Sequence, residues 1–91
     1  MPTPLGTVTD RYRRIHCVAL NPEVTLIQGA RVRFTFPGSI HQKPVSFEQE
    51  ASSIEVSRQQ VERVEPGTSC GLKIDGSVCL PPIGTEIVLL D

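Results

Sequence analysis

The stretch RVRFTF, residues 31–36, alternates apolar and polar side chains without a break. Every second residue is apolar, beginning with Val32, and the residues between them are polar, beginning with Arg31. Successive side chains of an extended chain point to opposite faces, so this period of two places the apolar residues on one face. The stretch therefore predicts a half-buried strand, with one face toward a core and the other toward solvent.

Strand-like patterns recur on both sides of this stretch. Residues 14–21 (RIHCVALN) are almost wholly apolar, and the turn residues 21–23 (NPE) separate them from a short connection, 24–30 (VTLIQGA). Apolar residues alternate again in 70–75 (CGLKID), and 85–90 (TEIVLL) ends in an apolar run. Six or so short strands with turns between them are typical of an all-β barrel or sandwich.

Long helices are not expected in this chain. Its 8 prolines and 7 glycines are spread along the sequence, and Val and Ile outnumber Leu, Met and Ala together. Two prolines bracket residues 37–44, which can hold neither a helix nor a strand ladder. We expect a loop there, with strand pairing resumed after it.

The segment 45–57 (VSFEQEASSIEVS) changes phase in its middle. Its first apolar residues, Phe47 and Ala51, have odd numbers, whereas Ile54 and the valine after it have even numbers. A bulge or bend at residues 52–53 would return both sets to one face. A helix over 45–65 is the alternative, but it leaves the valines outside its apolar stripe, so we favour strand.

Size and charge predict one domain, residues 1–91, and exclude general affinity for polyanions, since the net charge is -1. The first ten residues lack a basic segment followed by an apolar run, and no stretch is apolar enough to span a bilayer. We therefore expect a cytoplasmic protein with no membrane partner. The three cysteines, Cys17, Cys70 and Cys79, lack metal-site spacing and are expected to be reduced and mostly buried.

The pentapeptide GTSCG, residues 67–71, fits the G-x-S-x-G elbow of α/β-hydrolases. That elbow needs a strand before the serine, a helix after it and a histidine later in the chain. Here Pro66 and Gly67 precede Ser69, the residues after it read as a strand, and both histidines come earlier. We therefore predict no catalytic residue, and place Gly71 in a strand where a side chain would crowd a neighbour.

Other patterns give no site for a metal, a cofactor or a nucleotide. His16 and Cys17 are adjacent, so on a strand their side chains would point to opposite faces, one toward the core and one toward the surface. Cys70 and Cys79 could meet across a hairpin, but two thiols alone make no metal site, and core packing is the favoured role. The chain has neither glycine-rich phosphate-binding motif, which excludes nucleotide binding through those loops.

The basic residues suggest a binding surface. Three arginines surround a tyrosine near the N-terminus, and two more share the outward face of the strand predicted for 31–36. A patch of cations and an aromatic ring can hold phosphates and stack a base, although exposed arginines also protect strand edges from aggregation. The candidate RNA-binding residues are Arg11, Tyr12, Arg13, Arg14, Arg31 and Arg33.

The order of motifs along the chain resembles a known family. LGTVT (5–9), TLIQGARVRF (25–34), FEQEASSIEV (47–56), VEPGTSCGLKIDG (64–76) and PPIGTEIVLL (81–90) follow one another as in the second domain of translational GTPases, the β-barrel of elongation factor Tu and its relatives. The series is also similar to the C-terminal barrel of collagenase-like peptidases. The resemblance implies a small closed six-stranded β-barrel of the Greek-key type, the translation-protein domain 2 type, in which GTSCG is barrel architecture.

The resemblance implies no activity of the chain's own. Gly29 and Gly84 match family glycines that precede strands, whereas Ala30 and Thr85 stand where family members often have an acidic residue. The nucleotide-binding and peptidase domains of those families are not in these residues, so neither GTP hydrolysis nor proteolysis is implied. No individual contact residue is carried over.

Two functions follow as hypotheses. The first is a non-catalytic binding module, resembling a translation-factor barrel, that contacts RNA or the translation machinery through the six residues above. The second is an accessory subunit that docks onto a separately encoded enzyme or GTPase, and an exposed apolar patch on the barrel would favour it. An enzyme has no constellation of residues behind it.

Overall fold

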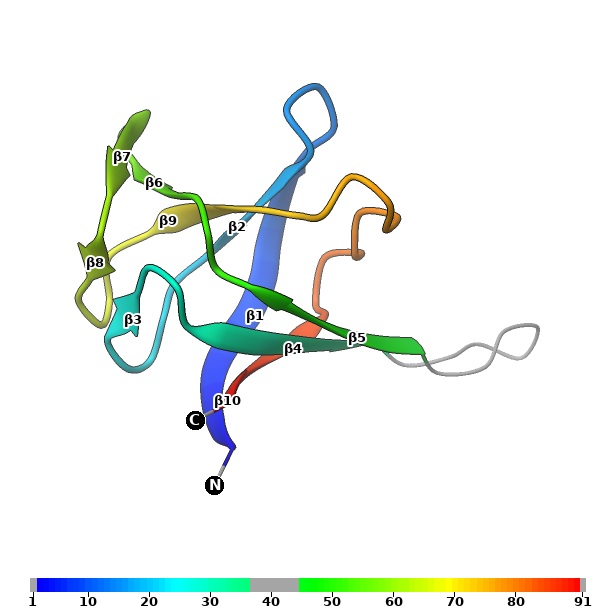
Figure 1. Ribbon diagram of the computed structural model, residues 1–91, viewed down its shortest axis with the longest axis horizontal. Coiled ribbons are helices and arrows are strands. Elements are labelled where there is room, and N and C mark those ends of the chain that lie inside the picture. The colour runs from blue at the N-terminus through cyan, green and yellow to red at the C-terminus, as the bar shows by residue number, and fades with distance from the viewer. Residues whose placement is uncertain (1, 37–44, 91) are drawn as a thin grey trace.

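The computed structural model of the chain describes residues 2–36 and 45–90, and its regular structure there consists of strands (Figure 1). This confirms the all-β prediction, while the loop predicted for 37–44 lies outside the described residues. No helix in this part of the chain is long and apolar enough to cross a membrane. The described strands are β1 (Thr3–Tyr12), β2 (Cys17–Leu20), β3 (Leu26–Ile27), β4 (Arg31–Phe36), β5 (Val45–Glu50), β6 (Ile54–Val56), β7 (Gln59–Val61), β8 (Arg63–Val64), β9 (Cys70–Lys73) and β10 (Glu86–Leu90).

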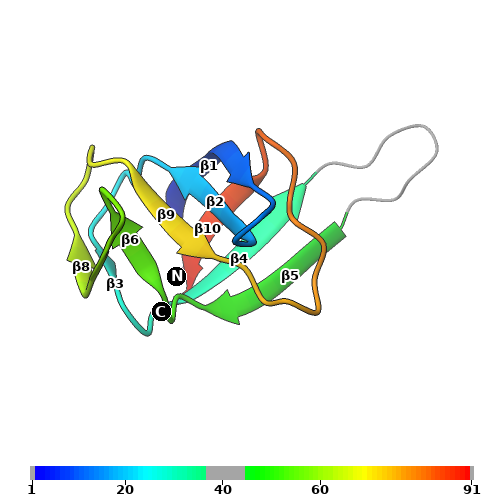
Figure 2. The same cartoon turned by 90° about the horizontal axis from the view of Figure 1, so that it is seen from above.

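Eight of these strands form one antiparallel sheet in the order β5-β4-β10-β1-β2-β9-β6-β7, and β3 pairs with β8 separately. The sheet curls around a common interior, so that strands from both ends of the chain enclose the same core (Figures 1 and 2). The observed arrangement is a curled eight-stranded half-barrel, and the closed six-stranded barrel is not confirmed. The strand expected over 14–21 is shorter than predicted, because only β2 pairs within it, and the short connection expected over 24–30 contains the two-residue strand β3.

The core follows from the alternation in β4. Val32 and Phe34 are fully buried, as predicted, while Arg31 is exposed. Phe34 lies opposite Phe47 of β5, and the two rings stack with centroids 4.9 Å apart. On its other side Phe34 lies opposite Ile87 of β10, which is also buried. These cross-strand contacts anchor one wall of the half-barrel around an aromatic pair.

The change of phase in residues 45–57 is a bend. β5 ends at Glu50, β6 begins at Ile54, and the two strands pair with different neighbours, β4 and β9. The buried Ala51 anchors the bend, because its N–H donates to Ala30 O at 2.7 Å and its carbonyl accepts from Gly29 N at 2.9 Å. The prediction of strand with a break at residues 52–53 is therefore confirmed.

His16 does not lie on a strand, and the opposite-face argument for His16 and Cys17 was wrong for that reason. It lies in the turn between β1 and β2 with φ 57°, and its ring Nε2 is 2.8 Å from Val78 O and 3.1 Å from Asp75 O. The ring thus ties the turn to the segment that follows β9. Cys17 is buried.

The three cysteines are free thiols. Cys17 and Cys70 are buried, as predicted, whereas Cys79 is exposed. The hairpin that could have joined Cys70 to Cys79 does not form, because β9 pairs with β2 and β6 and the next described strand is β10.

Candidate functional site

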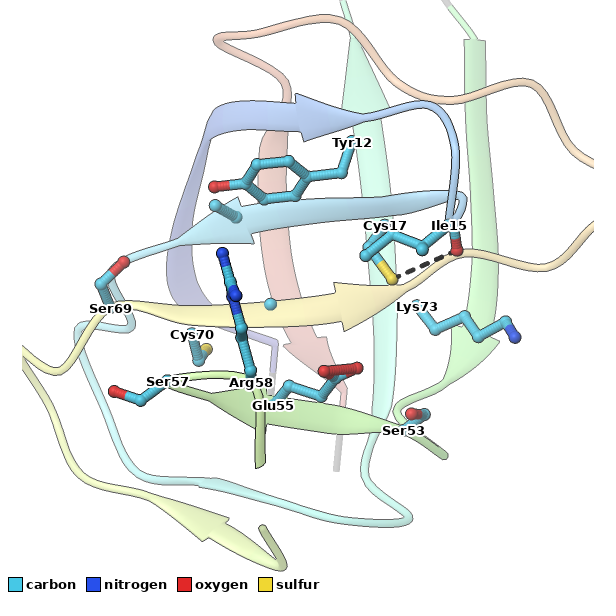
Figure 3. A pocket seen from close by; sticks show the side chains of 12 residues that line it. Tyr12, Ile15, Cys17, Ser53, Glu55, Ser57, Arg58, Ser69, Cys70 and Lys73 are labelled. Carbon is cyan, nitrogen blue, oxygen red and sulfur yellow. Dashed lines mark hydrogen bonds between the residues drawn. The ribbon is translucent and has the colours of Figure 1, made fainter. Parts of the chain in front are cut away.

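A groove of about 460 Å³ lies over β2, β9 and β6 (Figure 3). The register of these strands explains its position: Cys17 lies opposite Lys73, Ala19 opposite Gly71, and Gly71 opposite Glu55. The residues between them along each strand belong to the hydrophobic core. Because side chains alternate across a sheet, the residues Cys17, Ala19, Glu55 and Lys73 lie on the face opposite to these core residues.

Small residues make the floor of the groove, namely Cys17, Ala19 and Gly71. A Cβ added to Gly71 would lie 3.9 Å from the carbonyl oxygens of Val18 and Glu55, which is ordinary van der Waals contact. The prediction that a side chain at position 71 would crowd a neighbour is therefore wrong. The backbone there does not need a glycine, and the missing side chain instead leaves the floor open.

Two hairpin turns form the walls. On one side, Tyr12 ends β1 and Ile15 lies in the turn before β2, and these apolar side chains are 45% and 53% exposed. On the other side, the two-residue turn Ser57-Arg58 joins β6 to β7. The Arg58 side chain extends from this turn over the groove toward Tyr12 (Figure 3). An aromatic, an aliphatic and a guanidinium group therefore surround a floor of small residues.

Both turns hold residues other than glycine in the left-handed region. Ser57 and Arg58 have φ 52° and 68°, in the pattern of a type I′ turn, which favours Asn-Gly. This conformation costs an L-residue roughly 1–2 kcal/mol. Such strain clusters at binding sites, where the surrounding structure maintains it. Here it directs the Arg58 side chain to the groove.

The charged side chains of the groove have no ion pair with any described residue. They are Arg58, Lys73 and Glu55. Elsewhere in the described part of the chain, the arginines on β4 and β8 are paired. Arg31 and Arg33 share Glu48, at 3.2 and 3.1 Å, and Arg63 pairs with Glu65 at 2.6 Å. The groove thus combines exposed apolar side chains with charged side chains that have no ion pair with a described residue.

The predicted RNA-binding residues fall into two separate groups. Tyr12 lines the groove, Arg13 and Arg14 lie exposed in the turn beside it, and Arg11 is half-buried in β1. The other two arginines lie on β4, where position 33 pairs with Val88, and Val88 pairs with Pro4 at the far end of β1. Pro4 and position 11 are roughly 20 Å apart along an extended strand. The structure does not bring the two groups together, and RNA binding by these residues stays a prediction.

The sequence did not predict the wall of the groove that the turn Ser57-Arg58 forms, nor the full set of residues around it. Arg58 and Lys73 gave no motif, and Ile15 was assigned to a strand. The available indication was the hairpin 54–61, whose turn residues Ser57 and Arg58 are poor choices for its geometry. This mismatch between residues and turn conformation indicates a binding role only because the structure places the turn beside Tyr12.

The chemistry of the groove does not favour nucleophilic catalysis. Burial raises the pKa of the Cys70 thiol to about 11. Burial also raises the pKa of Cys17, the Glu55 carboxylate adds to this shift, and Lys73 opposes it. Neutral thiols are poor nucleophiles. Ser69 is exposed and β9 follows it where an elbow would need a helix, and no cluster of three or more His, Cys, Asp or Glu side chains in residues 2–36 and 45–90 could hold a metal ion.

Two solved structures share this fold. The C-terminal domain of a candidate U32 peptidase from Geobacillus thermoleovorans has a TM-score of 0.74 at 12% identity, over 96% of this chain and 91% of that one. Its selenomethionine variant has a TM-score of 0.75 at 14% identity, over 92% and 95%. No family profile and no curated protein sequence matches the chain. The likeness shows the fold, supports the resemblance to the C-terminal barrel of collagenase-like peptidases, and gives no support to the resemblance to translational GTPases.

Proposed function

We propose that this chain is a non-catalytic binding module that docks onto a partner protein through the groove over β2, β9 and β6. One observation carries the proposal: Tyr12 and Ile15 expose large apolar surfaces beside a hollow whose floor is made of small residues. Exposed apolar groups beside a hollow mark interaction sites, and tyrosine and arginine are the side chains that protein interfaces favour. The similar structures, each the C-terminal domain of a candidate peptidase, support a role beside another protein unit.

A protein partner fits the groove better than RNA does. Glu55 lies in the middle of the groove wall and would repel a continuous phosphate backbone. Arg31 and Arg33, which were to extend the RNA surface, share the carboxylate of Glu48. The net charge of -1 also gives no long-range attraction for a polyanion.

Site-specific photo-crosslinking in cells tests the proposal. Tyr12 is replaced by p-benzoylphenylalanine in one variant, and Ile27, an apolar residue of β3 that is 52% exposed and does not line the groove, is replaced in the control. We expect a discrete crosslinked protein from position 12 and none from position 27. Adding Gly71→Leu to the first variant should abolish the crosslink, because the leucine fills the floor, whereas Gly76→Leu, on an open turn, should preserve it.

Other crosslinking results would contradict docking of a protein through the groove. Equal crosslinking from positions 12 and 27, or a crosslink that survives Gly71→Leu, would contradict docking through the groove. A crosslinked species that ribonuclease shortens would replace the protein partner by RNA. Circular dichroism of each variant confirms that the loss of a crosslink does not come from unfolding.

We also propose that the half-barrel is a closed six-stranded barrel in which β5 and β6 count as one bent strand. The pairing of β5 with β4 and of β6 with β9 supports this description, as do the hydrogen bonds that anchor Ala51. Such a barrel would hold the groove rigid. Slow amide exchange is expected at Ala51, where β5 bends into β6, and at Asp75, which follows β9. Fast exchange at both positions would contradict closure.

A further inference from the structure

The cations that have no ion pair with any described residue lie in the groove or beside it. In the described part of the chain Arg31, Arg33 and Arg63 are paired with carboxylates. The unpaired cations lie in the groove or on the β1–β2 hairpin that forms its wall, and they are Arg11, Arg13, Arg14, Arg58 and Lys73. Among the lining residues themselves, two cations face one anion, Glu55, so the lining has a charge of +1. The groove is therefore complementary to an acidic ligand.

The two lining cations stand at opposite ends of the floor. Lys73 lies beside Cys17 at one end of β9, whereas Arg58 follows β6 at the other end, near Ser69 (Figure 3). The four-residue step from Lys73 back to Ser69 corresponds to about 13 Å of extended chain. Between the cations lie the small residues of the floor and the Glu55 carboxylate, so an anionic group of a ligand would find a partner only at the two ends.

This arrangement suits a peptide segment whose negative charges are separated along its chain. The Glu55 carboxylate would repel a polyanion with closely spaced phosphates. A peptide, in contrast, can place its carboxylates at Arg58 and Lys73 and an apolar side chain on the floor between them. In an extended peptide alternate residues face one side, so two carboxylates with an apolar side chain between them on that side are four positions apart, about 13 Å, which matches the step from Ser69 to Lys73.

We infer that the groove binds an extended acidic segment of the partner protein, in which two Asp or Glu residues four positions apart flank an apolar side chain. The carboxylates pair with Arg58 and Lys73, and the apolar side chain lies on Cys17, Ala19 and Gly71 against Tyr12 and Ile15. This inference rests on the proposed docking function and names the chemistry of the docked segment.

A phage-displayed library of random linear nonapeptides, selected on the intact protein, tests the inference. We expect enrichment of Asp and Glu around a central aromatic or large aliphatic residue. Binding of a selected peptide should weaken about fivefold with Arg58→Ala or Lys73→Ala, and further as salt is raised, while the matched control Arg63→Ala should stay within about twofold. Gly71→Leu should abolish binding and Gly76→Leu should not.

The outcomes separate the inference from the function on which it rests. Peptides that depend on an open position 71 but carry no acidic residues would overturn the inference and leave docking in place. A selection that yields no peptide sensitive to Gly71→Leu would contradict docking of such segments altogether. Displacement of selected peptides by a 20-nucleotide oligouridylate at equal concentration would identify RNA as the better ligand and overturn both.

Discussion

The side-chain amide of Gln49 accepts a hydrogen bond from the backbone N–H of Asp75 at 2.9 Å and so joins β5 to the segment after β9. Its Nε2 donates to the carbonyl of Lys73 at 2.8 Å, and both bonds flank the buried Ile74. One side chain thus satisfies the backbone groups that a further strand pairing would have used. It ties together segments 26 positions apart in the sequence.

Loss of this amide should loosen the half-barrel. Gln49→Ala removes both hydrogen bonds and is expected to lower the free energy of unfolding by about 1–2 kcal/mol. Gln60→Ala is the matched control, because the one hydrogen bond that Gln60 donates to a described residue goes to the Ser53 hydroxyl and not to the backbone, and its effect should stay below about 0.5 kcal/mol. Urea unfolding of the three proteins measures the difference, and equal effects would show that the Gln49 bridge contributes nothing specific.

Two glycines should respond oppositely to the same substitution. A Cβ at Gly6 would lie 2.9 Å from the backbone oxygen of Asn21, so Gly6→Ala should destabilise the protein by about 2 kcal/mol. At Gly71 the added Cβ meets only ordinary contacts, so Gly71→Ala should change stability by less than about 0.5 kcal/mol. A large loss at position 71 in thermal unfolding would mean that the floor of the groove is tighter than its geometry indicates.

The turn at Ser57 and Arg58 should be more stable with a sequence suited to its conformation. Replacing the pair by Asn-Gly, through Ser57→Asn and Arg58→Gly, is expected to raise the free energy of unfolding by about 1 kcal/mol, because both positions have positive φ. The same change should weaken peptide binding, since it removes the guanidinium group. Gln59→Gly, in the adjoining strand, should instead destabilise the protein by about 0.5–1 kcal/mol, and a similar loss from Arg58→Gly would refute strain in the turn.

The shared carboxylate on β5 should make stability depend on pH. Hydrogen bonds from Arg33 and then Arg31 lower the pKa of Glu48 from its usual 4.5. A carboxyl group with a lowered folded-state pKa adds stability that is complete above its unfolded-state pKa and is lost as the pH falls through the folded-state pKa. The urea midpoints of wild type and Glu48→Gln should therefore converge as the pH falls below about 4.5, and a constant difference down to pH 2 would contradict the ion pairs.

The elements that could be predicted from the sequence depend on neighbours in the chain. Alternation in residues 31–36 identified β4 and the burial of Val32 and Phe34, and the change of phase after Ala51 located the bend between β5 and β6. Side-chain direction along a strand follows from backbone geometry, so a few consecutive residues contain this information. The same local pattern excluded a nucleophile elbow at Ser69.

The groove could not be predicted in this way, because its residues come from distant segments. The sequence by itself determined an all-β chain, the approximate positions of its main strands and which face of β4 is buried. Only the tertiary structure placed Arg58 opposite Tyr12, gave Arg31 and Arg33 a common carboxylate in Glu48, and left Gly71 open as a floor. The physical reason is that alternation is a property of one strand, whereas strand order, register and turn conformation depend on how the curled sheet buries its core as a whole.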